Sequence, residues 1–226
     1  MTKHQVVIDQ REHVASFDIH AQNTFTPLCE NELPVAGGSE IVHELNENAK
    51  LANFRIGSKE AHSPHAAWVA TEEHPQLTPI VGENMDVRWK MHSVPGTKGF
   101  ELIKGLPQVT EYDYFVWQGI ELDMHPYGAC FHDFAEKLST GVIEFLRLHQ
   151  VTTVITSGLA TDYCVKATVN QLLAAQFKVV VNLAACRGFA IQTIEAAISE
   201  MQGNGALLVE NASQIIHASF ADIHTL

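Results

Sequence analysis

Cys164 is the residue whose type and position first suggest chemistry. It lies in the first turn of a predicted helix, after the apolar segment VTTVITS (151–157) and a short turn. The helix dipole and the unpaired N–H groups at such an N-terminus stabilise a thiolate and lower the pKa of the thiol. A free cysteine can equally be a small buried apolar residue. Position alone leaves a nucleophile and a core residue as equal interpretations.

A carboxylate and three imidazoles form a second group of chemical interest. Glu60 and His62 follow a predicted strand two residues apart, and on an extended segment such residues point to the same side. His65 and His92 come later in the chain. A carboxylate with few imidazoles suits zinc or iron and leaves positions open for water and substrate. Histidine-rich loops are also often merely solvated, so a metal site is one of two interpretations.

These residues depend on a sheet to bring them together. Short apolar segments rich in β-branched residues alternate with segments of helical periodicity, which is typical of βα units around a parallel sheet. The predicted fold class is α/β, with an open, mostly parallel, Rossmann-like sheet and helices on both faces. Such sheets bind ligands at the carboxyl ends of their strands. We expect strands at 13–19, from 54 onward, at 112–117, 151–157, 178–183 and 206–209, and helices at 40–53, 140–149, 161–176 and 191–201.

Residues 62–110 differ from the rest of the chain. They contain proline, histidine and glycine without a sustained helical or strand pattern. Loops of this length inside a compact domain usually carry a functional site. Because no internal repeat, low-complexity run or linker interrupts the sequence, we expect residues 1–226 to form a single domain.

The composition limits the classes of partner that we expect for this protein. The chain has 14 Lys and Arg against 26 Asp and Glu, a formal net charge of −12 at pH 7. Because a phosphate backbone or an anionic membrane requires clustered cations, we expect neither nucleic acid nor membrane as a partner. The sequence contains no signal-peptide pattern or membrane span, which predicts a cytoplasmic location and free thiols for the four cysteines. An apolar content of 46% leaves room for a dimer or larger homo-oligomer.

Several segments together resemble one family. SGLATDYCVKATVNQLL (157–173) is very similar to the nucleophile segment of nicotinamidases, which belong to the isochorismatase-like cysteine hydrolases. Four further segments match that family in order. QNTFTP (22–27) resembles QNDFTP, SKEAHSPHAAW (58–68) resembles SKDWHP..H..F, RWKMHSVPGTKG (88–99) resembles WP.HC..GT, and FVWQGIELDMHPYGACFHD (115–133) resembles a lysine-containing segment that ends in DSYSAF.

The resemblance implies an isochorismatase-like hydrolase fold and a specific reaction. Cys164 would attack the carbon of a small-molecule carboxamide, ammonia would leave, and water would hydrolyse the thioester to the acid. The backbone N–H groups of Ala160 and Cys164 would form the oxyanion hole, with a cis peptide bond between Leu159 and Ala160. Nicotinamide, or a close aromatic carboxamide, is the implied substrate.

The resemblance also implies a divalent metal, with zinc as the first expectation and iron or manganese as alternatives. The metal would bind the pyridine nitrogen of the substrate, and His65 lies near a fourth imidazole found in some family members. The implied metal ligands are Glu60, His62 and His92, and the implied walls of the ring pocket are Phe25, Trp89 and Tyr127.

Three positions depart from the family pattern. The catalytic aspartate of the family corresponds to His20, its lysine to Gln118, and its metal-binding aspartate to Glu60. Asp18 lies two residues before His20 on the same strand face and would replace it only if the strand shifts. Loss of one member of a buried Asp–Lys pair costs roughly 3–5 kcal/mol, whereas a neutral His and a neutral Gln restore the charge balance.

Two hypotheses follow from these departures. In the first, His20 is the general base of a Cys–His pair, and Gln118 holds either His20 or the substrate amide. In the second, Cys164 and the metal pocket bind a nicotinamide-like ligand without turnover. A hydrolase of another amide within the same superfamily is a further alternative.

Overall fold

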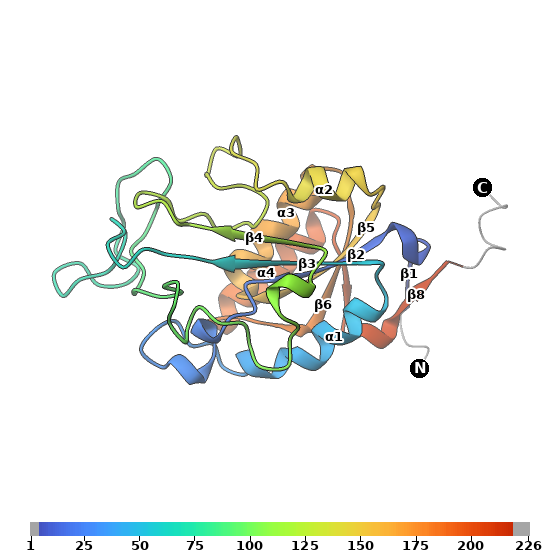
Figure 1. Cartoon of the computed structure of the whole chain (residues 1–226), viewed down its shortest axis with the longest axis horizontal. Helices are drawn as coiled ribbons and strands as arrows, with labels where there is room; N and C mark the ends of the chain where they lie inside the picture. The colour runs from blue at the N-terminus through green and yellow to red at the C-terminus, as the bar shows by residue number, and fades with distance from the viewer. Residues whose placement is uncertain (1–4, 219–226) are drawn as a thin grey trace.

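A six-stranded parallel sheet runs through the centre of the computed structural model, which describes residues 5–218 (Figure 1). Its strand order is β4-β3-β2-β5-β6-β7, and every neighbouring pair is parallel. This arrangement confirms the predicted α/β class and the open parallel sheet. The strands are β2 (Val14–Ile19), β3 (Phe54–Glu60), β4 (Tyr114–Gln118), β5 (Thr153–Leu159), β6 (Lys178–Arg187) and β7 (Leu207–Val209).

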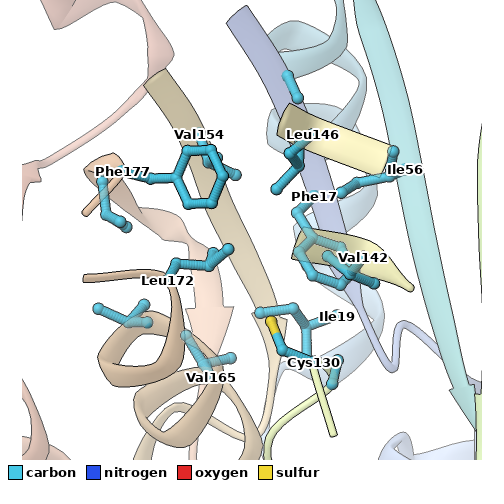
Figure 2. Packing of buried hydrophobic residues seen from close by; sticks show 14 of the residues in the cluster. Phe17, Ile19, Ile56, Cys130, Val142, Leu146, Val154, Val165, Leu172 and Phe177 are labelled. Carbon is cyan, nitrogen blue, oxygen red and sulfur yellow. The ribbon is translucent and has the colours of Figure 1, made fainter. Parts of the chain in front are cut away.

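Helices cover both faces of this sheet. Because side chains of a strand point alternately to its two faces, β2 contributes to two different apolar clusters. Phe17 and Ile19 pack against residues of α2 and α3 (Figure 2). Val14 packs with Leu51, just after α1. The helices are α1 (Val42–Lys50), α2 (Val142–Leu148), α3 (Lys166–Ala174) and α4 (Ile191–Gly203).

The carboxyl end of β5 differs from the prediction. The expected turn at 158–160 is wrong, because Gly158 and Leu159 continue the strand. Gly158 has φ +142° and pairs with Ile19, where a Cβ atom would lie 2.0 Å from the Ile19 carbonyl oxygen. Glycine therefore permits the close approach of β2 and β5 at this point.

The helix after β5 begins with an irregular turn. Thr161–Val165 form a π-helical turn, and α3 continues from Lys166. Cys164 lies in this π turn, and such turns are frequent at functional sites. The peptide bond between Leu159 and Ala160 is cis, as the resemblance implied.

Two short strands were missed at the sequence level, and one was longer than expected. β1 (Val6–Ile8) and β8 (Ile215–His217) pair in parallel to form a separate two-stranded sheet. Three residues are too few for an alternating pattern to be recognised. β6 continues to Arg187, beyond the predicted range 178–183.

The long loop was predicted correctly. Between β3 and the 3-10 turn η5 (Val109–Glu111), the chain contains no α-helix and no β-strand, and it extends beyond the carboxyl ends of β3 and β4 (Figure 1). Trp68 and Trp89 are buried in a second apolar cluster that anchors this loop. The Trp68 indole also donates a 3.0 Å hydrogen bond to the Met124 carbonyl oxygen, which joins the loop to the connection after β4.

Within residues 5–218, no helix is long and apolar enough to cross a membrane. The four cysteines are free thiols.

Candidate active site

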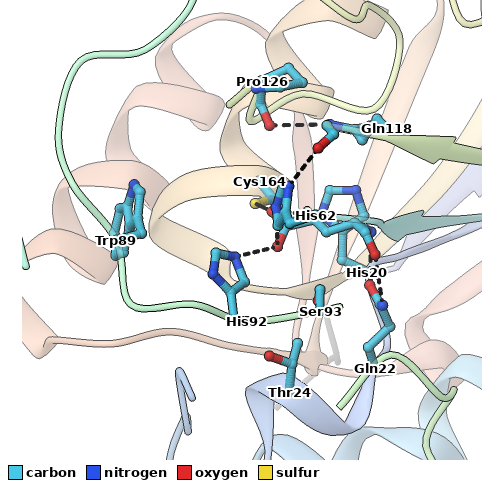
Figure 3. A network of polar contacts seen from close by, with 12 residues as sticks. His20, Gln22, Thr24, His62, Trp89, His92, Ser93, Gln118, Pro126 and Cys164 are labelled. Carbon is cyan, nitrogen blue, oxygen red and sulfur yellow. Dashed lines mark hydrogen bonds and ion pairs between the residues drawn. The ribbon is translucent and has the colours of Figure 1, made fainter. Parts of the chain in front are cut away.

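The candidate residues lie at the carboxyl ends of four neighbouring strands (Figure 3). His20 follows β2, Glu60 ends β3, Gln118 ends β4, and Cys164 follows β5. The strand order runs outward from β2 through β3 to β4, and the chain then returns to β5 on the other side of β2, so the order reverses between β2 and β5. This is the topological switch point at which open α/β sheets bind their ligands.

The Glu60 carboxylate contacts the sulfur of the candidate nucleophile. The Cys164 thiol donates to Glu60 Oε1 over 3.4 Å, and His20 Nδ1 lies 3.7 Å from the same oxygen. All three side chains are buried, and their reactive atoms lie within 4.8 Å of one another. A thiol, a carboxylate and an imidazole at these distances can move a proton away from sulfur as it attacks.

Gln22 fixes the backbone that carries this carboxylate. Its side-chain oxygen accepts a 2.8 Å hydrogen bond from the Glu60 N–H, and its amide nitrogen donates to the Glu60 carbonyl oxygen over 3.0 Å. The same nitrogen donates to the Phe100 carbonyl oxygen over 3.2 Å. Gln22 thus joins the end of β3 to the segment after β2, within the QNTFTP segment recognised in the sequence.

Two histidines direct their Nε2 atoms at Glu60. His62 Nδ1 donates to the Gly119 carbonyl oxygen (2.9 Å) and His92 Nδ1 to that of Lys90 (2.7 Å), since a carbonyl oxygen only accepts. In the neutral ring, Nε2 then carries a lone pair. These Nε2 atoms lie 3.5 and 3.0 Å from Glu60 Oε2. Because converging acceptors repel one another unless a cation lies between them, this donor set fits a divalent metal.

Burial shifts the pKa values of the titratable groups in the site. Burial raises the pKa of the Cys164 thiol well above its usual value, the Glu60 charge adds to this, and the Ala160 N–H opposes it. The predicted lowering of the thiol pKa is wrong, because desolvation outweighs the helix terminus. Burial also lowers the pKa of His20.

A pocket with aromatic walls opens onto these groups. Its empty space, including the open mouth, is about 250 Å³. Cys164, Glu60 and His92 line one part of it, and the Trp89 indole donates to the Tyr127 hydroxyl over 3.2 Å in another. The three aromatic residues named from the sequence, Phe25, Trp89 and Tyr127, all lie on its wall, together with Ala160 and the unanticipated residues Leu33, Tyr163 and Phe189.

Two residues considered at the sequence level lie outside the cluster. Asp18 does not reach the cysteine: its Oδ2 accepts from Arg55 (2.7 and 2.9 Å) and from the Tyr112 hydroxyl (2.9 Å). His65 is exposed on the loop. Asp18 is therefore paired with Arg55 and not with the cysteine. His65 lies apart from the other imidazoles.

Gln118 lies beside His20, where its side chain acts to raise the pKa of that imidazole against the larger effect of burial. Its amide nitrogen donates to the carbonyl oxygens of Pro126 (3.2 Å) and Gly128 (3.4 Å). The side chain therefore holds the segment after β4, which includes Tyr127, against the end of that strand.

His125 is a further residue that sequence reasoning missed, and it lines the same pocket. It is buried, and one of its ring nitrogens lies within 4.8 Å of ligand nitrogens of His62 and His92. The available signal was its place in the segment 115–133, immediately before the residues that resemble the end of DSYSAF.

The sequence is similar to known hydrolases. The isochorismatase domain family matches residues 19–213. The nicotinamidase of Escherichia coli (strain K12) is 36% identical over 197 residues, which cover 76% of this chain and 87% of that relative.

Solved structures agree with this similarity. A nicotinamidase and pyrazinamidase from Acinetobacter baumannii superimposes with a TM-score of 0.82 at 24% identity, covering 91% of this chain and 99% of that one. The yeast nicotinamidase bound to the inhibitor nicotinaldehyde gives 0.79 at 21% identity, covering 88% and 100%. The pyrazinamidase of Pyrococcus horikoshii in complex with zinc gives 0.70 at 25% identity, covering 87% and 98%. The chain therefore belongs to the isochorismatase family, as a nicotinamidase-like hydrolase.

Proposed function

We propose that this protein hydrolyses nicotinamide, or a close aromatic carboxamide, to the acid and ammonia. The observation that carries the proposal is the contact between the Cys164 thiol and the Glu60 carboxylate inside an aromatic pocket. Support for the substrate class comes from the nicotinamidase relatives and from the nicotinaldehyde complex of the yeast enzyme. A flat heteroaromatic ring fits walls made largely of aromatic side chains.

In the acylation step, Glu60 takes the proton of the thiol. Because burial keeps Cys164 protonated at rest, a base must act as sulfur attacks the carboxamide carbon. Glu60 Oε1 accepts that proton, and the backbone N–H groups of Ala160 and Cys164 stabilise the oxyanion. The C–N bond then breaks, and the amide nitrogen leaves as ammonia with the proton from Glu60. A thioester to Cys164 remains.

Deacylation uses the same groups in the reverse order. Water attacks the thioester carbon while Glu60 Oε1 accepts one of its protons. The C–S bond breaks, the proton returns from Glu60 to the sulfur, and the acid leaves. One carboxylate thus serves both half-reactions.

His20 takes a supporting part in this proposal. The sequence suggested it as the base that acts directly on Cys164. In the structure, the carboxylate of Glu60 contacts the sulfur, and His20 lies 3.7 Å from the same carboxylate oxygen. We assign His20 the positioning of Glu60, and Gln118 the positioning of the segment that carries Tyr127.

A divalent metal completes the proposed site. His62 and His92 would hold it beside Glu60 Oε2, and when bound it would supply a Lewis-acidic position for the pyridine nitrogen of the substrate. Trp89 and Phe25 would then hold the ring so that its carboxamide faces Cys164.

The test is ammonia release from nicotinamide by the zinc-loaded protein. We expect release that is abolished in Cys164→Ala and retained in Cys29→Ala, since Cys29 lies outside the pocket. Wild-type protein that binds nicotinamide calorimetrically without releasing ammonia would contradict the proposal. The second candidate function is a protein that binds a nicotinamide-like ligand without turnover, and the His20 and Gln118 replacements favour it. A panel of other small carboxamides would then show whether the protein hydrolyses a different amide or only binds its ligand.

A further inference from the structure

We propose that His125 is a third imidazole ligand of the metal site, beside His62 and His92, and that it makes the site favour zinc over manganese. The set implied by family resemblance has a carboxylate, which suits manganese, beside only two imidazoles, which suit zinc. A third imidazole makes the site rich in nitrogen. The inference concerns metal binding alone and does not depend on which amide is hydrolysed.

The geometry of the three rings is the first support. One nitrogen from each of the three histidines lies within 4.8 Å of the other two, and all three side chains are buried. The His62 and His125 rings are stacked with centroids 5.0 Å apart, and the His92 and His125 centroids are 5.7 Å apart. Three imidazoles gathered this closely are a recurrent zinc-binding set.

The hydrogen bonds of the rings are the second support. The Nδ1 atoms of His62 and His92 are occupied by backbone carbonyl oxygens, so both rings present Nε2 to the cluster. Both ring nitrogens of His125 are buried without a hydrogen-bond partner among residues 5–218. An imidazole buried in this way loses its hydration without replacement, unless a ligand supplies it.

The position of His125 is itself fixed from several sides. Its N–H donates to the Asn84 carbonyl oxygen over 2.8 Å. Its ring packs edge-on to Trp68 (4.5 Å between centroids) and parallel to Trp89 (5.9 Å). A ligand ring held by packing and by its backbone is preorganised, which lowers the entropy cost of binding a metal.

A further consequence concerns Glu60. With three imidazoles as ligands, a metal would need at most one oxygen of this carboxylate, and Glu60 Oε2 is available 3.0 Å from His92 Nε2. Oε1 remains directed at Cys164. The extra imidazole therefore compensates for the second task that Glu60 takes in the proposed reaction.

The experiment measures zinc binding without substrate, so an inactive enzyme leaves its result intact. X-ray absorption of the zinc-loaded protein is expected to show three imidazole ligands in the wild type and two in His125→Phe. Phe keeps a ring between Trp68 and Trp89 but offers no ligand nitrogen. Competition with a chromophoric chelator is expected to show zinc binding weakened about tenfold or more. Manganese binding is expected to change less, so that zinc selectivity falls.

The matched control is His65→Ala, which removes an exposed imidazole from the loop that carries His92 and is expected to leave zinc binding unchanged. His125→Ala provides a second variant, and cooperative urea unfolding of each variant verifies that it is folded. Two imidazoles in the wild type, or wild-type zinc affinity in folded His125→Phe, would overturn the inference. An altered KM with unchanged zinc affinity would likewise refute it, because His125 would then contact substrate only.

Discussion

At the scale of single residues, one methylene group changes what the active-site carboxylate reaches. Glu60 occupies the position where the family resemblance implies an aspartate. Its longer side chain places one oxygen 3.4 Å from the Cys164 sulfur and the other 3.0 Å from His92 Nε2. The base position of the family holds His20, which carries no negative charge. In the proposed reaction, Glu60 therefore takes the role of base that His20 does not fill.

Shortening the Glu60 side chain tests its proposed role as the base that acts on Cys164. In Glu60→Asp the carboxylate stays beside the histidines but withdraws from Cys164. We expect kcat to fall about 100-fold or more, the usual contribution of a general base, while zinc content is retained. Ammonia release and metal analysis on the same sample measure both. Adding His20→Asp to this variant is expected to restore part of the rate, and full activity of Glu60→Asp alone would contradict the proposed role.

Asp18 tests the distinction between a structural and a catalytic carboxylate. Its removal in Asp18→Ala leaves the Arg55 guanidinium and the Tyr112 hydroxyl without their partner. We expect a loss of about 3 kcal/mol in the free energy of unfolding, measured with urea, and no change in kcat for the protein that remains folded. The exposed Asp123→Ala is the matched control. A loss of turnover at unchanged stability would instead make Asp18 part of the catalytic site.

At the scale of elements, the sequence predicts the strands of the sheet better than the contacts at their carboxyl ends. Segments rich in Val, Ile and Thr, such as 151–157, identify the buried strands, because β-branched residues are enriched in strands. The extension of β5 through Gly158 depends on its close contact with Ile19 in β2, which no local pattern reveals. Likewise, the resemblance identified Glu60, His62 and His92, whereas His125 joins them only through the packing of Trp68 and Trp89.

The turn after β4 provides an element-scale prediction. Gly119 has φ +77°, and a Cβ atom there would lie 2.4 Å from His62 Cε1. Gly119→Ala therefore forces the His62 ring away from the carbonyl oxygen that orients it. We expect zinc affinity to fall about 10–100-fold in chelator competition. Gly96→Ala is the control, since Gly96 has φ +86° with no atom within 4 Å of the added Cβ. Equal effects of the two substitutions would assign the loss to backbone conformation alone.

At the scale of the whole molecule, the candidate metal ligands join parts of the chain that are far apart in sequence. Glu60 and His62 come from the end of β3, His92 from the long loop, and His125 from the connection after β4. The loop and that connection also meet where the Asn84 carbonyl oxygen accepts from the His125 N–H. A bound metal would therefore act as a cross-link at the pocket, and its removal is expected to loosen the walls more than the sheet.

Metal removal tests this directly. A ligand present at 100 times its dissociation constant stabilises the folded state by about 2.7 kcal/mol. For a domain of this size, that corresponds to a Tm higher by roughly 5–10 °C than after chelation. Hydrogen exchange of the chelated protein is expected to rise in 84–93 and 119–128, because these segments would lose the shared ligand, while β2 and β5 stay protected by their ladder. The His125→Phe variant should show a smaller zinc-dependent Tm shift. An unchanged Tm on chelation, with exchange unchanged in both segments, would show that the fold holds the pocket without a metal.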